Sequence, residues 1–197
     1  MAQWDLYVVI TTGLGRGRST LELVRRSLDG GATAIQLREK DLPARELVEL
    51  GCSIRELTRQ AGAALIVNDR LDVALAVEAD GLHIGQDDLP AAVARQLLGP
   101  DKILGVSVGT PAEARQAAAA GADYLGAGPF YATGSKGDTG SPIGPEGLKA
   151  IKAAVRIPVV GIGGINESNA AAVIAAGADG VAVISAVISV PDISSAA

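Results

Sequence analysis

The chain has 197 residues, 48% of them hydrophobic and 20% charged, with a formal net charge of -5 and a sequence pI near 4.9. This length suits one domain over residues 1–197, and the acidic balance with only 3% aromatic residues argues against a nucleic-acid partner. The apolar run near the C-terminus is interrupted by Gly177, Asp179 and Gly180, so no membrane span is expected. Cys52 is the only cysteine and no secretory signal is recognisable, which predicts a cytoplasmic protein.

Short β-branched or apolar runs recur along the chain and predict strands. They cover residues 5–12, 34–39, 64–69, 81–85, 103–108, 123–130, 158–164 and 180–185. Segments rich in Ala, Leu, Glu and Arg lie between them, so strands and helices alternate as in a parallel α/β protein. Eight such units in roughly 200 residues predict a closed (β/α)₈ TIM barrel, and an open doubly wound sheet is the alternative.

Four of the predicted helix-to-strand junctions resemble one another. They read GGATAIQL, EADGLHI, AGADYLGA and AGADGVAV. Glycine adopts the left-handed conformation easily just after a helix, and the residues that follow it lead into the next strand. The junctions therefore indicate an internal repeat.

The segment 34–41, AIQLREKD, begins as a buried strand and ends in four charged residues. Side chains alternate between the two faces of a strand, so Ile35 and Leu37 are expected to face the outer helices. The even-numbered side chains then line the inside of the barrel, at the carboxyl end where such barrels carry their active site. These side chains are Gln36, Arg38 and Lys40. The alternative is a solvated start of a loop.

Acidic residues follow the next two predicted strands. Asp69 closes ALIVND, and Asp88 follows GLHIG. Carboxylates at neighbouring strand ends suit Mg²⁺, which takes one or two carboxylates and completes its shell with water and phosphate oxygens. The alternative role is helix capping, since each acid precedes a predicted helix.

The predicted loop after the sixth strand, FYATGSKGDTGSPIGPEG, is rich in Gly, Ser and Thr. Its backbone amides, the hydroxyls of Thr133 and Ser135 and the ammonium of Lys136 suit a phosphate. The run GIGGI at 161–165 and the turn at 184–186 occupy the usual phosphate site of these barrels. A disordered connection and glycines that only permit tight turns remain the alternatives.

His83 is the only histidine and lies in an apolar predicted strand, which favours a structural role. Cys52 falls on a predicted helix, where we expect it to pack against its neighbours. A Ser-His-Asp triad would need His83, and no G-x-S-x-G motif accompanies it. The inventory favours chemistry driven by a metal ion, cationic side chains and substrate positioning.

Motifs along nearly the whole chain together resemble the thiamine phosphate synthase family. They are QLREK at 36–40, VNDR at 67–70, HIGQDDLP at 83–90, LGVSVG at 104–109, TGSK at 133–136, VVGIGGI at 159–165 and ADGVAVIS at 178–185. The resemblance implies a (β/α)₈ transferase that joins hydroxymethylpyrimidine diphosphate to hydroxyethylthiazole phosphate with Mg²⁺, giving thiamine phosphate and pyrophosphate. It also implies that a pyrimidine methyl cation forms and is trapped by the thiazole nitrogen.

The resemblance also assigns residues. The pyrimidine diphosphate would be held by Gln36, Leu37, Arg38, Glu39, Lys40, Asn68, Ser107 and Lys136. Of these, Arg38, Lys40, Ser107 and Lys136 would be catalytic, and Asp69 and Asp88 would bind Mg²⁺. The thiazole phosphate would be received by Thr133, Gly134, Ser135, Gly164, Ile184 and Ser185.

The chain departs from the family in two places. The family usually reads Thr-x-Thr-Lys where this chain has Thr133-Gly134-Ser135-Lys136, and it continues into a last helix where this chain stops at DISSAA. We expect Asp192 to cap a final outer helix that is truncated. Part of the outer face near the first, seventh and eighth strands would then be uncovered, which allows a homo-oligomer.

Two other functions fit the same barrel. A thiazole tautomerase would not need the paired acids or the diphosphate-binding cations, and a non-catalytic sensor would bind thiazole phosphate without turnover. QLREK together with both acids favours the synthase.

Overall fold

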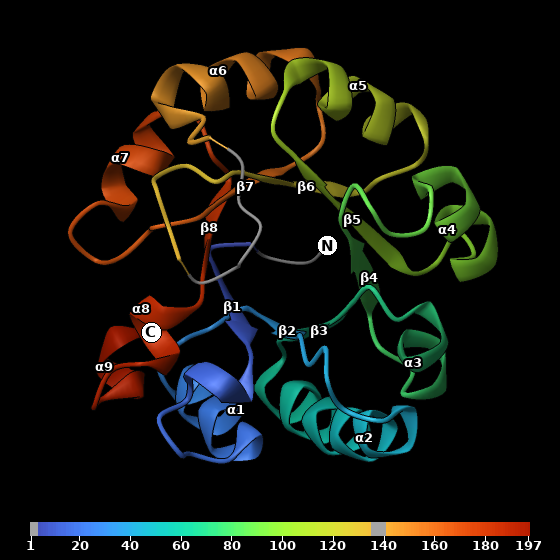
Figure 1. Ribbon diagram of the computed structural model, residues 1–197, viewed down its shortest axis with the longest axis vertical. Coiled ribbons are helices and arrows are strands. Elements are labelled where there is room, and N and C mark those ends of the chain that lie inside the picture. Colours follow the sequence, from blue (N-terminus) through green and yellow to red (C-terminus); the bar gives the residue numbers. More distant parts are fainter. Residues whose placement is uncertain (1–3, 135–140) are drawn as a thin grey trace.

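The computed structural model describes residues 4–134 and 141–197. Eight parallel strands follow one another in chain order, and β8 pairs with β1 to close the barrel (Figure 1). The strands are β1 (Leu6–Ile10), β2 (Ala34–Leu37), β3 (Ala64–Asn68), β4 (Gly81–Ile84), β5 (Ile103–Val108), β6 (Tyr124–Ala127), β7 (Val159–Ile162) and β8 (Gly180–Val183). The predicted closed (β/α)₈ barrel is confirmed, and the open sheet is excluded.

Helices surround the barrel (Figure 1). They are α1 (Thr20–Asp29), α2 (Ala44–Ala61), α3 (Leu71–Ala76), α4 (Ala91–Leu98), α5 (Pro111–Ala119), α6 (Gly144–Ala154), α7 (Ala170–Ala175), α8 (Ser185–Ile188) and α9 (Ile193–Ala196), with a 3₁₀ turn at Thr12–Leu14. Side-chain oxygens of Ser19 and Thr110 accept backbone N–H groups in the first turns of α1 and α5, which fixes where these helices begin. Within the described ranges, none of the helices has the length and apolar character needed to cross a membrane.

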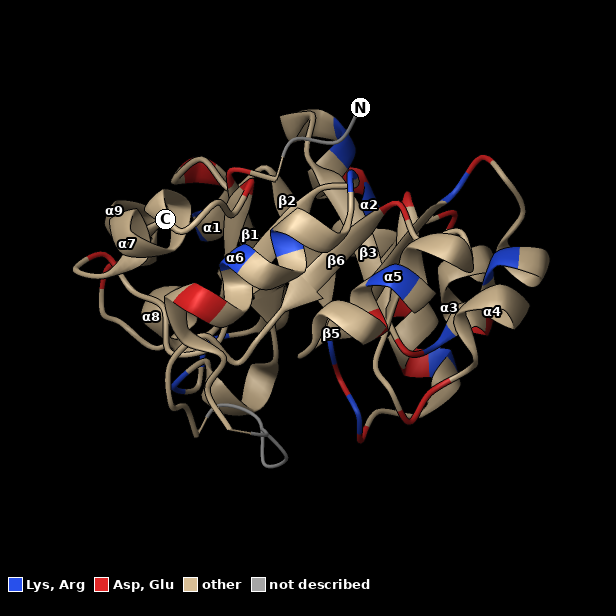
Figure 2. Cartoon of the chain, turned by 90° about the horizontal axis from the view of Figure 1, so that it is seen from above, with Lys and Arg blue, Asp and Glu red and all other residues tan. Residues whose placement is uncertain are grey.

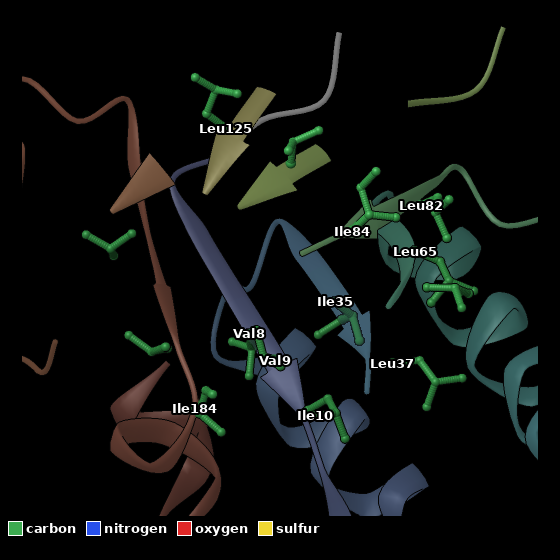
Figure 3. Packing of buried hydrophobic residues seen from close by; sticks show 14 of the residues in the cluster. Val8, Val9, Ile10, Ile35, Leu37, Leu65, Leu82, Ile84, Leu125 and Ile184 are labelled. Carbon is green, nitrogen blue, oxygen red and sulfur yellow. The ribbon is translucent and has the colours of Figure 1, made fainter. Parts of the chain in front are cut away.

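Apolar side chains form two separate layers. The larger layer fills the space between strands and helices and includes Ile35 and Leu37 (Figure 3). The smaller layer lies inside the barrel and is built around Trp4, Tyr7 and Tyr124. Alternation along the strands produces this division, since successive side chains point to opposite faces. The predicted outward orientation of Ile35 and Leu37 is therefore confirmed.

The four similar junctions all tie a strand to the strand before it. Asp80, Asp123 and Asp179 each accept the backbone N–H of a residue in the preceding strand at 2.7 Å. Thr33 accepts the N–H of Leu6 at 3.3 Å in the equivalent place. Each of these residues also donates its own backbone N–H to that same residue of the preceding strand. The internal repeat is thus a clamp that joins β1 to β2, β3 to β4, β5 to β6 and β7 to β8.

Charged residues of both signs lie mostly on the helices and loops, and the strands are largely uncharged (Figure 2). Cys52 is exposed on α2. The expectation that it packs against neighbouring residues is therefore wrong. The buried residues Leu47, Gly51 and Ile54 of α2 recur at three- to four-residue spacing and form one face of the helix, and Cys52 lies off that face.

The C-terminal segment follows the predicted pattern. Asp192 caps α9 by accepting the backbone N–H of Ser195 at 3.1 Å. Beside α9 lies a groove of about 550 Å³, with Leu6, Val181 and Ala170 among its lining residues. These residues come from β1, β8 and α7, so the groove occupies the sector where incomplete cover was expected. Whether copies of the chain associate through it stays a prediction.

Candidate active site

Three neighbouring strand ends bring polar side chains to one edge of the barrel. β2 pairs with β3, and β3 pairs with β4, so the residues that follow these strands are neighbours. Arg38 is half-buried and Lys40 is exposed after β2, and Asn68 and Asp69 are half-buried at the end of β3. The Lys40 ammonium lies 3.6 Å from the Asp69 carboxylate. The predicted cationic and acidic groups therefore meet at the carboxyl end of the barrel.

Asp69 has unusual surroundings. Its φ angle of +60° is uncommon for a residue with a side chain, and its backbone N–H donates to the carbonyl of His83 at 2.9 Å. The pKa of Asp69 is raised to about 6, first by burial and then by the hydrogen bond and negative charge of Asp88, against the opposing charges of Lys40 and Arg38. Two carboxylates share a small space here, which is an arrangement that a divalent cation would stabilise.

Helix capping does not explain either acid. The residues that precede α3 and α4 are Arg70 and Pro90, and neither helix has a side-chain cap. Asp88 instead accepts the backbone N–H of Gly85 at 2.7 Å, which holds its carboxylate in the loop after β4. The capping alternative is wrong because Arg70 and Pro90 occupy the cap positions and no side chain caps either helix.

The acid pair fits Mg²⁺ by its chemistry. The described residues contain no cluster of three or more His, Cys, Asp and Glu side chains that would make a site built only from protein ligands. Mg²⁺ usually keeps several waters and binds through one or two carboxylates together with substrate phosphates. Asp69 and Asp88 supply two carboxylates and so meet that requirement.

The inside of the barrel below these strand ends is polar on one side. Gln36 is 2% exposed, and its Nε2 donates to the Tyr7 hydroxyl at 2.7 Å. Its Oε1 atom is buried and has no hydrogen-bond partner among the described residues. Ser107 of β5 is half-buried, and its Oγ lies 2.9 Å from Nε2 of His83. Gln36 and Ser107 therefore both face the interior, as their predicted roles require.

Two residues of the predicted binding segment point elsewhere. Leu37 is 1% exposed and belongs to the apolar layer beneath the helices, so its side chain does not reach the inside of the barrel. Glu39 accepts hydrogen bonds from the backbone N–H and the hydroxyl of Thr12, in the loop after β1. Glu39 thus fastens that loop to the end of β2. The structure brings only the even-numbered members of this segment to the site.

Glycines shape the opposite side of the site, after β6 and β7. Tyr131 donates its backbone N–H to the carbonyl of Gly163 at 3.0 Å, which joins the two loops. Gly164 has a φ angle of +67°, and a Cβ there would lie 2.7 Å from Cβ of Tyr131, so no other residue fits without displacement. This brings Gly164 close to the loop that contains Thr133 and Gly134.

The other predicted phosphate residues lie at the end of the barrel or beyond the described ranges. Ile184 is buried and directly precedes α8, and Ser185 is the exposed first residue of that helix. Ser135 and Lys136 lie outside the described residues. The roles of all these residues stay predictions.

Sequence reasoning missed the residues that support the site. Gln86 donates from its side chain to the backbone carbonyl of Ser107 at 2.6 Å and so links the loop after β4 to β5. Tyr7 and Tyr124 bond to each other at 2.9 Å between their hydroxyls, inside the barrel. One signal was present in the sequence: Gly105 and Gly126 interrupt apolar strands, and such glycines often mark a close neighbour.

Fold and site together define an enzyme of the (β/α)₈ class with its polar groups at the carboxyl ends of the strands. Residues 6–187 match the thiamine monophosphate synthase family, and the chain belongs to that family. The chain is 78% identical to the thiamine-phosphate synthase of Moorella thermoacetica, over all of this chain and 94% of that one. It is 54% identical to the thiamine-phosphate synthase of Chloroflexus aurantiacus, over all of this chain and 91% of that one.

A solved structure gives the same result. The thiamine phosphate pyrophosphorylase from Pyrococcus furiosus is 47% identical and superposes with a TM-score of 0.91. The match covers 99% of this chain and 92% of that one. Likeness in sequence and in structure therefore extends over the whole barrel.

Proposed function

We propose that this chain joins 4-amino-2-methyl-5-hydroxymethylpyrimidine diphosphate to 4-methyl-5-hydroxyethylthiazole phosphate, giving thiamine phosphate and pyrophosphate. One observation carries the proposal beyond family membership. Asp69 and Asp88 crowd together beside Lys40 at adjacent strand ends, with the charge of Arg38 acting on the same carboxylate. This combination suits a diphosphate that arrives together with Mg²⁺.

The proposed chemistry follows from the charges. Breaking the carbon–oxygen bond of the diphosphate concentrates negative charge on the departing pyrophosphate, and fixed cations stabilise that charge as it develops. Arg38 and Lys40 lie where they can do so, and Lys136 has the same role by sequence. Asp69 and Asp88 would hold Mg²⁺, which when bound neutralises phosphate charge.

Positioning of the second substrate completes the reaction. The thiazole nitrogen that attacks the pyrimidine methyl carbon is neutral, so no side chain has to remove a proton from it. Asn68 and Ser107 would orient the diphosphate substrate. The thiazole phosphate would lie on the opposite side, at Thr133, Gly134, Ser135, Gly164, Ile184 and Ser185, where backbone amides and hydroxyls supply donors.

We also propose that the protein works in the cytoplasm. A lone exposed thiol on Cys52 is compatible with a reducing compartment.

The direct test is to incubate the purified protein with both substrates and Mg²⁺ and to measure thiamine phosphate and pyrophosphate. Equal amounts of the two products are expected, and neither should form when the pyrimidine diphosphate is omitted. Asp69→Asn with Asp88→Asn is the matched variant, because it keeps the size of both side chains and removes their charge.

Other outcomes would identify the alternative functions. Isomerisation of a thiazole phosphate without the pyrimidine substrate would indicate a tautomerase. Binding of thiazole phosphate with no product under any condition would indicate a sensor. Either result would overturn the proposed synthase.

A further inference from the structure

Five side chains form one continuous hydrogen-bond chain across the inside of the barrel. Gln36 of β2 donates from Nε2 to the Tyr7 hydroxyl at 2.7 Å, and the hydroxyls of Tyr7 and Tyr124 are 2.9 Å apart. The Tyr124 hydroxyl lies 2.8 Å from Nδ1 of His83, whose Nε2 lies 2.9 Å from Oγ of Ser107. The chain therefore connects the two interior residues that the proposed function assigns to the pyrimidine substrate.

The amide at one end gives the bonds one consistent direction. The Nε2 atom of Gln36 only donates, so the Tyr7 oxygen accepts from it, and the Tyr7 proton is then available to the Tyr124 oxygen. The Tyr124 proton then points to Nδ1 of His83, which leaves the ring proton on Nε2. That proton is donated to Ser107, whose own hydroxyl proton is free to point into the site.

Burial keeps the protons in place along this row of hydrogen bonds. Tyr7 and Tyr124 are 2% and 0% exposed, and burial raises the pKa of both phenols, so each keeps its proton. His83 is 6% exposed. Water therefore has little access to compete for these bonds, and the low polarity around them strengthens each one.

Glycines in the neighbouring strands leave room for the rings of Tyr124 and His83, which lie in the middle of the row of hydrogen bonds. A Cβ on Gly105 of β5 would lie 2.2 Å from Cζ of Tyr124, and a Cβ on Gly126 of β6 would lie 3.0 Å from Cε1 of His83. Both glycines thus leave space that a ring occupies. Trp4 stacks on Tyr124 with 4.0 Å between ring centroids and supports it from below.

The opposite direction would suit an anionic substrate poorly. If the Gln36 amide were turned around, every donor would reverse and the Ser107 proton would point at His83. Ser107 would then present only lone pairs to the site. A diphosphate needs donors, so the direction set by Nε2 of Gln36 is the one that fits the substrate.

We propose that Tyr7, Tyr124 and His83 are positioning residues that hold His83 as the Nε2–H tautomer and so make Ser107 a hydrogen-bond donor to the phosphorylated substrate. This role for Ser107 rests on the proposed function. The direction of the hydrogen bonds can be tested without that function, because it determines the tautomer of His83 in the protein without substrate.

The tautomer is directly measurable, because His83 is the only histidine in the sequence. Protein labelled with ¹⁵N-histidine should give, at pH 7 and without substrate, ¹⁵N resonances of a neutral ring protonated at Nε2. In Tyr124→Phe the two ring-nitrogen resonances should move toward each other, because Nδ1 has lost its donor. A ring protonated at Nδ1, or at both nitrogens, would overturn the inference.

A double-mutant cycle tests whether Tyr124 acts through Ser107. Tyr124→Phe should lower kcat about tenfold, which corresponds to one well-placed hydrogen bond. In the Ser107→Ala background the same change should lower kcat less than about twofold, since the group that it positions is absent. Equal losses in both backgrounds would overturn the positioning role.

A control separates positioning from general loss of a buried hydroxyl. Ser27 is fully buried on α1 and donates to the carbonyl of Leu23 at 2.8 Å, away from the barrel interior. Ser27→Ala should leave the His83 resonances and kcat unchanged. Absence of thiamine phosphate synthesis in the unaltered protein would count against the proposed function alone, because the tautomer is read without substrate.

Discussion

Carboxylates at the two ends of the barrel have opposite surroundings. At the amino end, Asp80, Asp123 and Asp179 each accept a backbone N–H at 2.7 Å and pair with a basic side chain. Those partners are Arg55, Arg95 and Lys152. At the carboxyl end, Asp69 lies against Asp88, and its cationic neighbour Lys40 is 3.6 Å away.

This difference distinguishes carboxylates that stabilise the fold from carboxylates that are available to bind a ligand. The amino-end carboxylates find their partners within the protein, so their charges are satisfied as soon as the strands pair. The Asp69 and Asp88 carboxylates repel each other when both are ionised, and a bound cation would relieve that repulsion. The same residue type thus stabilises one end of the barrel and leaves the other end reactive.

The largest effect is expected at the carboxyl end. Arg38→Ala should lower turnover about 100-fold, since losing one charge-assisted contact to the transition state costs about 3 kcal/mol. Circular dichroism and the melting temperature should stay close to those of the unaltered protein, because Arg38 is only half-buried. Lys136→Ala should behave in the same way. Near-normal turnover would remove that residue from the mechanism.

Breaking a clamp at the amino end should lower stability and leave turnover nearly unchanged. Asp123→Ala removes the acceptor of the Leu104 N–H and the partner of Arg95, and should lower the free energy of unfolding by about 2 kcal/mol. Urea unfolding measures this loss. With Mg²⁺ and substrates at saturation, kcat should stay within about twofold, because the clamp lies at the opposite end from the site. A stable variant with reduced kcat would contradict the separation of the two ends.

The barrel and part of its site were predictable from local patterns. Alternating faces correctly predicted that Ile35 points outward and Gln36 inward, and the acids after two adjacent strands were correctly placed side by side. The capping alternative could be rejected only from the structure, because the sequence does not show that Arg70 and Pro90, and not the two acids, occupy the cap positions. The Tyr7–Tyr124 contact joins residues 117 positions apart, which no local pattern reveals.

The raised pKa of Asp69 predicts a pH effect of intermediate size. Its folded-state pKa of about 6 exceeds its ordinary value of 3.8, so the folded protein holds this proton more tightly than the unfolded chain does. The contribution of Asp69 to the free energy of unfolding is fully present below about pH 4 and is lost as the pH rises through 6. Without Mg²⁺, the unfolding free energy should therefore fall by about 1 to 2 kcal/mol between pH 5 and pH 7 from this group alone.

Asp69→Asn isolates that contribution. Asparagine tolerates the positive φ angle and does not titrate, so the pH-dependent loss should be absent from the variant. The variant should also need more Mg²⁺ for activity than the unaltered protein. If the free energies of unfolding of the two proteins changed in parallel between pH 5 and pH 7, the raised pKa of Asp69 would not contribute to stability, and the prediction would be wrong.

The smallest effect is expected where an ion pair lies in solvent. Arg55 and Arg59 are one helical turn apart on α2 and reach Asp80 and Glu78 respectively. The Arg55 and Asp80 side chains are 16% and 31% exposed, whereas those of Arg59 and Glu78 are 55% and 76% exposed. Water screens the second pair, and its long side chains lose freedom when they meet.

Arg59→Ala should therefore change the free energy of unfolding by less than about 0.5 kcal/mol. Arg55→Ala should cost roughly 2 kcal/mol, because it leaves the half-buried carboxylate of Asp80 without its cation. Urea unfolding of both variants in low and high salt compares the two directly. Salt should further reduce the small Arg59 effect and leave the Arg55 effect nearly unchanged, since partly buried pairs are screened less. Equal costs for the two variants would mean that burial does not determine which charges hold the amino end together.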